Sequence, residues 1–311
     1  MSTSSLIDLA PQLPTVSFEL FPPRGTESDE AVWARILRMA EAGPDFFTVT
    51  YGASGSARES SDGIVHRLLT ETAVPVVAHL TCAGATREEL AARVRSLLDA
   101  GVRDFLALRG DPPAGQTAWV PAPGGVAGSA DLVRLIREVQ SGHPAAPDVT
   151  VAVAAYPSGH NSGVGEIAAL LAKQAVGADY AITQVFYDAE AYATLVRDAR
   201  AAGVTLPIVP GILPLTERRR LARLEELTGV PVPVSLDALL DVQDDAVRLR
   251  RGLDATLALI DRVLAVGAPG LHLYTFNRDR PALDVLDHLR ARGVVNPALV
   301  GSGTTSAPPL P

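Results

Sequence analysis

One pattern repeats along most of this chain and limits the folds it can adopt. A short run rich in Val, Ile, Phe and Thr is followed each time by a longer segment with the periodicity of an amphipathic helix. We predict eight strands, at residues 15–20, 45–50, 74–80, 103–108, 149–155, 180–186, 206–210 and 271–276. Helices are predicted between them, for example at 28–42, 87–100, 130–140, 162–177, 189–202 and 216–228. A strand–helix unit that recurs about every 30 to 40 residues implies parallel strands joined by right-handed crossovers.

The eight units favour a closed barrel over an open sheet. A (β/α)8 TIM barrel, which is an α/β fold, needs about 250 residues, and the chain has 311. The competing fold is a doubly wound sheet, but no GxGxxG motif follows the first strand. Polar residues also follow many different strands, whereas an open sheet gathers them at one switch point. We therefore predict a TIM barrel with extra helices, within 229–268, before the last strand.

We predict that residues 14–296 form the barrel as a single catalytic domain and that residues 1–13 form an N-terminal extension before it. Residues 297–311 are rich in Pro, Ser and Gly and are expected to form a disordered tail. Residues 112–128 show no periodicity, so we predict a long loop of the kind that often carries function.

Composition narrows the class of protein. With 47% hydrophobic residues the chain can bury a large core, yet it has no apolar run of the roughly 18 to 20 residues that span a membrane. The first residues lack the pattern of a signal peptide, so a cytoplasmic protein is expected. A net charge of −8 argues against nucleic acid as a partner. Cys82 is the only cysteine, which excludes an intrachain disulfide and a thiolate metal cluster, and no metal site is predicted.

The predicted strand ends carry the candidate functional residues. Parallel barrels bring the carboxyl ends of their strands to one face, where their active sites lie. The residues at those ends are Glu19, Thr50, Tyr51, His79, Arg109, Gly110, Asp111, Tyr156, His160, Gln184, the turn at 210–214, Tyr274, Asn277 and Arg278. Taken singly, each is explained by a helix cap or a loop hydrogen bond. Glu19 is different, because a carboxylate in an apolar strand costs several kcal/mol if it stays charged and unpaired. We expect its pKa to be raised, as a general acid requires.

Eight short blocks at these strand ends resemble, in order, the signature of a known family. They are SFELFPPR, VTYGASG, AHLTC, LALRGDPP, AAYPSGH, AITQVFYD, PGILP and LYTFNR. Together they are similar to the 5,10-methylenetetrahydrofolate reductases over about residues 14–292. The resemblance implies an enzyme of one-carbon metabolism and methionine biosynthesis that reduces 5,10-methylenetetrahydrofolate to 5-methyltetrahydrofolate. Its reductant would be NADH or NADPH, which in this family usually acts through FAD.

The same resemblance implies roles for individual residues. Glu19 would protonate N10 as the folate ring opens, and Asp111 would stabilise the resulting N5 iminium cation. Gln184 would orient the pterin or the nicotinamide, and Arg278 would pair with the glutamate carboxylate of the folate. The positions that match the family's flavin contacts are Thr50, His79, Arg109, Gly110, Tyr156, His160, Glu166 and Lys173.

The chain departs from the family pattern mainly where the nucleotide half of FAD would lie. Gly128 and Ser129 precede the fourth helix where the family commonly has a Tyr-Ala pair. Glu166 and Ala169 stand for the usual Asp and Asn, and Arg218 replaces an aromatic residue after PGILP. The resemblance therefore leaves FAD open, since some members of the family are thought to pass hydride directly from NADH to the folate.

Two other functions remain as alternatives. The first is a folate- or nucleotide-binding barrel that has lost catalysis, and the presence of Glu19, Asp111 and Gln184 together argues against it. The second is a flavin barrel of the proline dehydrogenase type, which the blocks RGDPP and SFELFPP do not favour. The choice between NADH and NADPH and the oligomeric state are not predicted from the sequence.

Overall fold

The computed structural model describes residues 2–8, 13–22, 28–51, 55–110, 119–145, 148–159 and 161–297. Within these residues, nine parallel strands form one sheet in the order β7-β6-β5-β4-β3-β2-β1-β9-β8. Their bounds are β1 (Thr15–Leu20), β2 (Phe46–Val49), β3 (Val76–Thr81), β4 (Asp104–Leu108), β5 (Thr150–Ala155), β6 (Tyr180–Thr183), β7 (Ile208–Val209), β8 (Gly211–Ile212) and β9 (Gly270–Tyr274).

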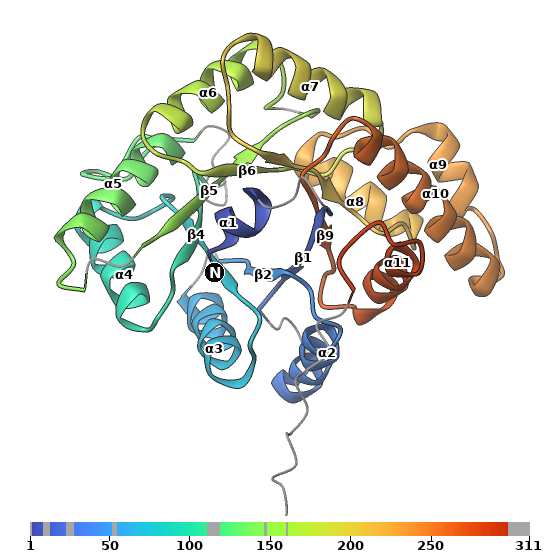
Figure 1. The fold of residues 1–311 in the computed structure, drawn as a ribbon, viewed down its shortest axis with the longest axis horizontal. Helices are drawn as coiled ribbons and strands as arrows, with labels where there is room; N and C mark the ends of the chain where they lie inside the picture. The colour runs from blue at the N-terminus through green and yellow to red at the C-terminus, as the bar shows by residue number, and fades with distance from the viewer. Residues whose placement is uncertain are drawn as a thin grey trace, which may run out of the picture.

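The sheet closes on itself at Pro210. β7 and β8 form the two edges of the sheet, yet this one residue alone separates them in the chain. Proline has no backbone N–H to donate, which interrupts a strand, while the Pro210 carbonyl still accepts a hydrogen bond from the His272 amide at 3.0 Å. β7 and β8 are therefore two pieces of one barrel strand. The predicted TIM barrel is confirmed (Figure 1).

All eight predicted strand positions hold a strand of the barrel, with shifted ends in some cases. β1 has the predicted bounds, whereas β6 ends at Thr183 and not at residue 186. Gln184 starts the loop after β6, and its side-chain oxygen accepts a hydrogen bond from the Val185 amide at 2.8 Å. The seventh strand runs from 208 to 212 and not from 206 to 210.

Helices surround the barrel (Figure 1). Their bounds are α1 (Thr3–Asp8), α2 (Asp29–Glu41), α3 (Gly55–Glu71), α4 (Arg87–Asp99), α5 (Ser129–Gly142), α6 (Val164–Ala175), α7 (Ala189–Ala201), α8 (Arg218–Thr228), α9 (Val234–Leu240), α10 (Asp245–Ala265) and α11 (Asp279–Ala291). The boundaries of α4 follow from its sequence: Thr86 and Glu89 form a capping box at its start, and Gly101, with φ of 99°, follows its end. The extra helices predicted before the last strand are α9 and α10.

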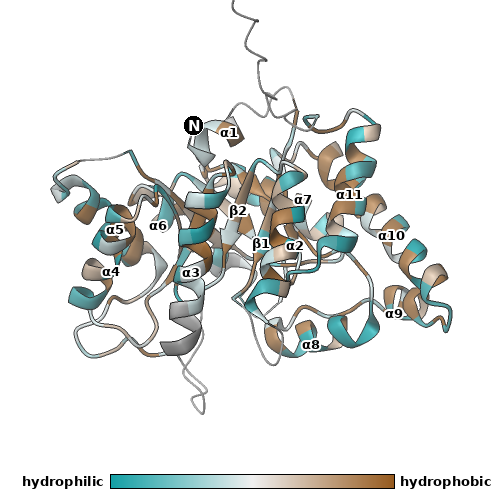
Figure 2. Ribbon diagram, turned by 90° about the horizontal axis from the view of Figure 1, so that it is seen from below, coloured by the Kyte–Doolittle hydropathy of each residue, from teal (hydrophilic) through white to brown (hydrophobic). Residues whose placement is uncertain are grey.

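Alternate residues along each strand pack into two different cores. From β1, Val16, Phe18 and Leu20 face the helices and belong to the large outer core. The side chains inside the barrel form a separate cluster of Ile7, Phe46, Val77, Leu106, Ala152, Tyr180, Ile182 and Val209. Figure 2 shows the apolar colour concentrated on the strands and on parts of the surrounding helices.

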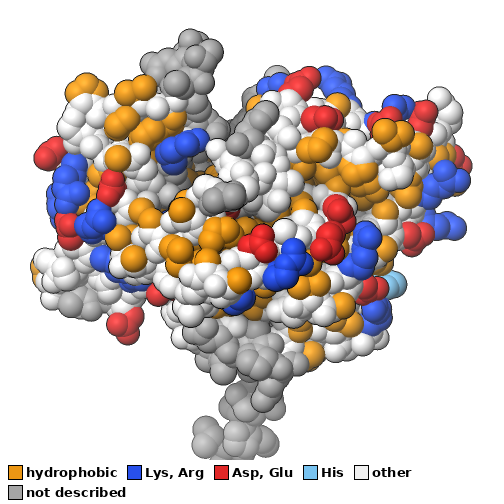
Figure 3. All heavy atoms as spheres, turned by 90° about the horizontal axis from the view of Figure 1, so that it is seen from above, with side chains coloured by type: hydrophobic (Ala, Val, Ile, Leu, Met, Phe, Trp, Pro, Cys, Tyr) orange, Lys and Arg blue, Asp and Glu red, His pale blue; other side chains and the backbone are white. Residues whose placement is uncertain are grey.

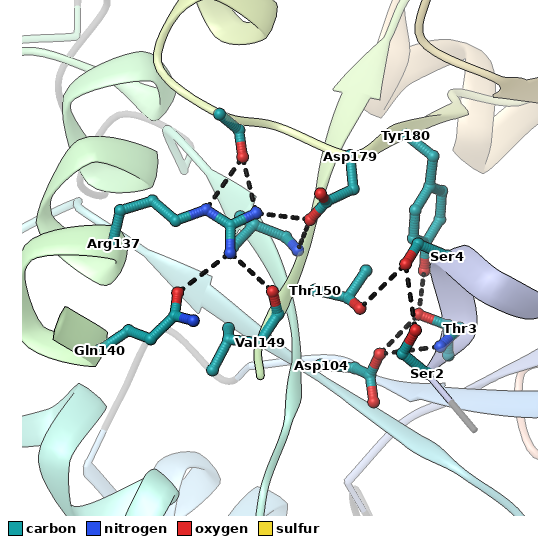
Figure 4. Close-up of polar contacts among 12 residues, drawn as sticks. Ser2, Thr3, Ser4, Asp104, Arg137, Gln140, Val149, Thr150, Asp179 and Tyr180 are labelled. Atoms are coloured by element: carbon teal, nitrogen blue, oxygen red, sulfur yellow. Dashed lines mark hydrogen bonds and ion pairs between the residues drawn. The ribbon is translucent and has the colours of Figure 1, made fainter. Parts of the chain in front are cut away.

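The short helix α1 covers the N-terminal end of the barrel (Figures 1 and 2). Its Ile7 joins the inner apolar cluster. Thr3 donates to Asp104 Oδ1 from both its amide and its hydroxyl, at 3.1 and 2.7 Å, and Tyr180 donates to the Thr3 hydroxyl at 3.3 Å (Figure 4). The N-terminal extension expected at 1–13 is thus partly a structural element that closes the barrel.

A third apolar cluster lies beyond the carboxyl ends of β6 and β8. It consists of Val185, Tyr187, Leu213, Leu215, Leu221, Val230 and Leu240, to which α8 and α9 contribute. The partly buried rings of Tyr274 and Phe276 pack against it. This side of the barrel mouth is therefore covered by apolar residues.

The face of the molecule seen in Figure 3 is mixed in character. On the face that Figure 3 shows, acidic and basic side chains are interspersed among apolar ones. In the same described part, the helices are all too short or too polar to serve as a membrane span. The tail predicted at 297–311 lies, apart from its first residue, outside the described residues.

Candidate active site

Glu19 lies inside the barrel near the carboxyl end of β1. Its neighbours in the sheet register are Thr48 of β2 and Tyr274 of β9, and only 7% of the residue is exposed. Its Oε2 lies 3.8 Å from Nε2 of His79 on β3 and 3.8 Å from Nε2 of His272 on β9. The predicted burial of this carboxyl group is confirmed, and its immediate neighbours are two imidazoles.

The two histidines differ in their surroundings. Burial lowers the pKa of His79 to about 4, although the Glu19 carboxylate acts in the opposite direction. His79 is therefore neutral at pH 7, and its Nε2 has no hydrogen-bond partner among the described residues. His272 is fully buried, and its Nδ1 lies 2.8 Å from the Ser17 hydroxyl. Two imidazoles and one carboxylate can suggest a metal centre, but the described part of the chain contains no group of metal-ligating side chains placed to share an ion.

Tyr274, the last residue of β9, lies beside Glu19 in the barrel mouth. Its hydroxyl donates to the Thr183 carbonyl at 2.7 Å, and burial, followed by the charge of Glu19, raises its pKa well above the usual range. The ring crosses directly over Gly211: a Cβ there would lie 2.7 Å from Tyr274 Cε2 and 2.2 Å from the Thr183 carbonyl oxygen. Gly211 of the PGILP turn is thus needed for close approach, and it fixes where the tyrosine lies.

The loops after β1 and β9 are joined at the rim of the barrel. The side chain of Asn277 accepts from the Phe21 amide at 2.8 Å and donates to the Phe21 carbonyl at 2.6 Å. The rings of Phe21 and Phe276 stack with centroids 4.8 Å apart, and the Arg220 guanidinium lies 5.1 Å from the Phe276 ring centroid. Phe276 and Asn277 have φ of 50° and 56°, a conformation that costs energy for residues other than glycine and is kept when the surroundings enforce it.

Glu166 and Lys173 of α6 form a second polar cluster, next to the carboxyl end of β5. Glu166 is buried and accepts from the Tyr156 amide at 3.2 Å, and burial raises its pKa to about 7 against the opposing effect of Lys173. The Lys173 ammonium donates to the Ala154 carbonyl at 2.8 Å and lies 3.9 Å from Glu166. Burial lowers the pKa of Lys173. The carboxyl group of Glu166 and the amino group of Lys173 therefore face each other and the backbone at the end of β5.

The end of β4 carries Arg109 and Gly110. The Arg109 guanidinium is exposed and lies 5.7 Å from the Trp119 ring centroid, and its carbonyl accepts a contact from the Cys82 thiol at 3.1 Å. Gly110 has φ of 84°, and a Cβ there would lie 2.8 Å from Ala83 Cβ. Only glycine is accommodated at this turn without strain.

The structure brings together some of the residues predicted for the site and leaves others apart. Glu19, His79 and Tyr274 meet in the barrel mouth, with Gln184 at the end of β6. The buried hydroxyl of Thr50, just past β2, has no hydrogen-bond partner among the described residues. Asp111 and His160 lie outside the described residues.

Two arginines are held by neighbouring carboxylates: Arg278, which the resemblance suggested for the site, and Arg218, which departs from the family pattern. Arg278 is half exposed, pairs with Glu217 at 2.8 Å, and lines a cleft of about 480 Å³ beside α10. Arg218 pairs with Asp237 and Asp241 at 2.5 and 2.7 Å. Arg218 thus connects α8 to the segment around α9, and this pairing accounts for it without a ligand.

His272, Ser17 and Thr48 were not predicted for the site. The sequence pattern that could have indicated Ser17 and His272 is the alternation of side chains along a strand, in which every second residue points inward. Ser17 lies two residues before Glu19 on β1, and His272 lies two residues before Tyr274 on β9. That alternation indicates which side chains share the barrel interior, and a closed barrel makes its first and last strands neighbours, but neither pattern indicates that His272 lies beside the Glu19 carboxyl group.

Sequence comparison places this chain in a known family. The family model described as methylenetetrahydrofolate reductase matches residues 7–290. The chain belongs to the methylenetetrahydrofolate reductase family. A 5,10-methylenetetrahydrofolate reductase of Escherichia coli is 34% identical over 280 residues, which are 88% of this chain and 90% of that one. Methylenetetrahydrofolate reductase (NADH) 1 of Zea mays is 33% identical over 287 residues, and there the match covers only 48% of the maize protein. The chain therefore spans about half the length of this plant methylenetetrahydrofolate reductase.

Solved structures support the fold of this family member. A protein from Clostridium thermocellum, described as binding two copies of 5-methyl-5,6,7,8-tetrahydrofolic acid, has a TM-score of 0.65 at 17% identity. The match covers 93% of this chain and 97% of that one. A putative phosphonomutase from Burkholderia cenocepacia has a TM-score of 0.52 at 15% identity. At these identities the similarity shows the barrel and not the ligand.

Proposed function

We propose that this protein reduces 5,10-methylenetetrahydrofolate to 5-methyltetrahydrofolate with NADH. The observation that carries the proposal is the buried carboxyl group of Glu19 at the barrel mouth, in a chain of the methylenetetrahydrofolate reductase family. Barrel enzymes of this architecture place their chemistry at the carboxyl ends of the strands. NADH is proposed over NADPH because the maize relative is named as an NADH enzyme.

The reaction needs one proton and one hydride. The bond between the methylene carbon and N10 breaks, its electron pair stays on N10, and Glu19 supplies the proton that N10 takes up. Hydride from the nicotinamide then reduces the N5 iminium carbon to a methyl group, leaving NAD⁺. Glu19 is proposed as the acid because its carboxyl group is buried at the carboxyl end of a barrel strand, where barrel enzymes place their chemistry.

Three further residues complete the proposed site. Asp111, next to Gly110, would stabilise the iminium cation by its charge. Gln184, which begins the loop after β6, would orient the pterin or the nicotinamide. Arg278 would bind the glutamate carboxylate of the folate, and its place beside the 480 Å³ cleft is compatible with a flexible substrate tail.

The residues at the flavin positions do not fit a tightly held FAD. The resemblance gives two cations suited to the flavin phosphates: Arg109, which is exposed, and Lys173, which is 5% exposed and donates to a strand carbonyl. Gly128 and Ala169 offer no polar side chain where the family pattern has larger residues. His79 Nε2 and the Thr50 hydroxyl remain suitable for a ring bound in the mouth. We therefore include in the proposal a direct hydride transfer from NADH to the folate.

Two measurements test the proposal on the purified protein. Oxidation of NADH should depend on methylenetetrahydrofolate, with sequential kinetics because both substrates must be bound together. The absorbance spectrum should show no flavin after denaturation. Folate binding without any NADH oxidation would instead support a barrel that has lost catalysis. One FAD per chain with parallel double-reciprocal lines would support the flavin mechanism.

A further inference from the structure

Two imidazoles lie at the same distance from one oxygen of Glu19, but among the described residues their Nε2 atoms have different hydrogen-bond surroundings. Both His79 Nε2 and His272 Nε2 are 3.8 Å from Glu19 Oε2. The Nε2 atom of His79 has no hydrogen-bond partner among the described residues, so it is suited to contact a ligand. The His272 ring is fully buried and held from several sides.

The anchoring of His272 comes from three neighbours inside the barrel. Ser17 is its register partner across the β1–β9 pair. The Ser17 hydroxyl lies 2.8 Å from His272 Nδ1 and also donates to the Leu271 carbonyl at 3.3 Å. The Thr48 hydroxyl lies 3.5 Å from Nε2, and the Tyr274 ring stands edge-on, with centroids 5.4 Å apart and an interplanar angle of 82°. The ring cannot turn without losing these contacts, so Nε2 is held toward Glu19.

A general acid needs such a support because the last torsion of a glutamate side chain is broad and roughly two-fold. Without a fixed neighbour, the carboxyl group would spend much of its time with its proton directed away from N10. Close positioning of the reacting groups accounts for much of the rate that an active site provides. The backbone of Glu19 is also fixed, since its carbonyl accepts from the Thr275 hydroxyl at 2.5 Å.

We propose that His272, held by Ser17, is a positioning residue that keeps the Glu19 carboxyl group oriented for proton transfer to the substrate. This inference rests on the proposed function. The proton that reaches N10 leaves the Glu19 O–H bond, and His272 neither gains nor loses a proton in that step. His79, whose Nε2 lies 3.8 Å from the same carboxyl oxygen, is assigned to ligand contact and not to this support.

The test uses two variants of His272, each of which puts an amide in the place of one of the two imidazole nitrogens. In His272→Asn the amide replaces the Nδ1 side of the ring, so the contact with Ser17 is kept and the group facing Glu19 is lost. In His272→Gln the amide reaches the position of Nε2, so the group facing Glu19 is kept. We expect kcat for methylenetetrahydrofolate reduction to fall about 10- to 100-fold in His272→Asn, which is at most the lower end of the usual contribution of a general acid, about 10² to 10⁴. The loss in His272→Gln should be clearly smaller, and KM for both substrates should stay within about two-fold in each variant.

The decisive measurement is a double-mutant cycle with Glu19→Gln. If His272 acts through Glu19, then His272→Asn should add little to the loss already caused by Glu19→Gln. The pH profile of kcat provides a second readout, in which His272→Asn should move the limb that reports the acid. Among the described residues, the titratable groups facing Glu19 are His79 on β3 and His272 and Tyr274 on β9, so His79→Asn is profiled alongside.

Controls separate this inference from a loss of fold and from a failure of the proposed function. His143→Asn removes an imidazole that pairs with Asp99 at 3.1 Å outside the barrel, and it should leave kcat unchanged. If His272→Asn does not fold, Ser17→Ala removes only the anchoring hydroxyl and should lower kcat several-fold with KM unchanged. The inference would be overturned if His272→Asn lowered kcat by the same factor in the wild type and in Glu19→Gln, or if it raised KM alone. A wild-type protein that does not reduce methylenetetrahydrofolate would overturn the proposed function itself.

Discussion

Both ends of the barrel contain similar types of polar residue, but the hydrogen bonds that these residues make differ between the two ends. At the N-terminal end, Asp104, Thr3 and Tyr180 form a connected set of hydrogen bonds under α1. Close by, Arg137 donates to the Gly177 and Val149 carbonyls and to Asp179 (Figure 4). At the C-terminal end, the His79 Nε2 and Thr50 hydroxyl groups have no hydrogen-bond partner in the described part.

The Thr15 hydroxyl at the start of β1 also lacks a partner in the described part, but the difference between the Asp104 cluster and the pair His79 and Thr50 indicates which end contributes stability and which end contributes chemistry. Buried polar groups are normally paired, and each exception requires an explanation. A binding site is one such explanation, because its groups are completed by the ligand. Variants at the C-terminal end should therefore lower activity with little change in stability, and variants at the N-terminal end should do the reverse.

The largest effect is expected at Asp111, on the C-terminal side. Asp111→Asn removes the charge that would stabilise the iminium cation, and loss of one preorganised electrostatic contact slows a reaction by about 10² to 10³. Single-turnover reduction of methylenetetrahydrofolate measures this step, and NADH binding measured by fluorescence should be unchanged. Equal loss of both would indicate that Asp111 supports the structure of the site.

A somewhat smaller effect is expected at Glu19. Glu19→Gln keeps the shape of the side chain but removes the acid, so turnover should fall by about 10², the lower range for general acid catalysis. The melting temperature should stay close to that of the wild type, and this is the result that distinguishes the C-terminal end. A folded variant with the parent rate would show that another group protonates the folate.

At the other end, Asp104→Ala should change stability and not turnover. The substitution leaves two donors of Thr3 without their shared acceptor, and each buried unsatisfied group costs about 1 to 3 kcal/mol. Urea unfolding should show a loss of that order, with kcat within about two-fold of the wild type. Thr3→Ser, which keeps the hydroxyl donor, is the matched control and should lose much less. A large fall in kcat in a stable Asp104→Ala protein would contradict the division between the two ends.

The smallest effect concerns the pH dependence of stability near Glu166. Burial raises the pKa of this carboxyl from an ordinary value of 4.5 to about 7. Between these two values the folded protein holds a proton that the unfolded chain has released, so the free energy of unfolding contributed by Glu166 decreases as pH rises. Glu166→Gln stays neutral and should flatten this slope between pH 4.5 and 7 in urea unfolding. An unchanged slope would mean that Glu166 is already ionised in the folded protein at the lower pH.

Most of the fold could be predicted because it depends on local patterns. Apolar runs, helical periods and glycines after helices indicated the strand–helix repeat, and parallel connections made the barrel the favoured closure. The interruption at Pro210 was missed, because a proline at the edge of a predicted strand does not reveal that the flanking pieces pair with different neighbours. Helix α1 was also missed, since six residues carry too little periodicity and its partners Asp104 and Tyr180 are distant in sequence.

The site was predictable to the extent that it follows from strand ends. Glu19 was identified because a carboxylate in an apolar strand is costly and therefore informative. His272 was not, because histidine in a strand is compatible with an ordinary core position, and its importance lies in the pairing of β1 with β9. Lys173 shows the opposite case, in which the resemblance suggested a phosphate contact and the fold turned the ammonium toward a backbone carbonyl.

The β1–β9 pair also has a consequence for how the protein acquires its activity during synthesis. Ser17 and His272 are 255 residues apart in sequence, and bringing such distant segments together carries a loop-closure entropy that must be overcome before the contact contributes. In a growing chain, Glu19 is synthesised long before His272. Under the proposed role of His272, an incomplete chain with most of the barrel already formed would still lack the support of its acid. The catalytic centre would then be assembled in the same late step that closes the barrel.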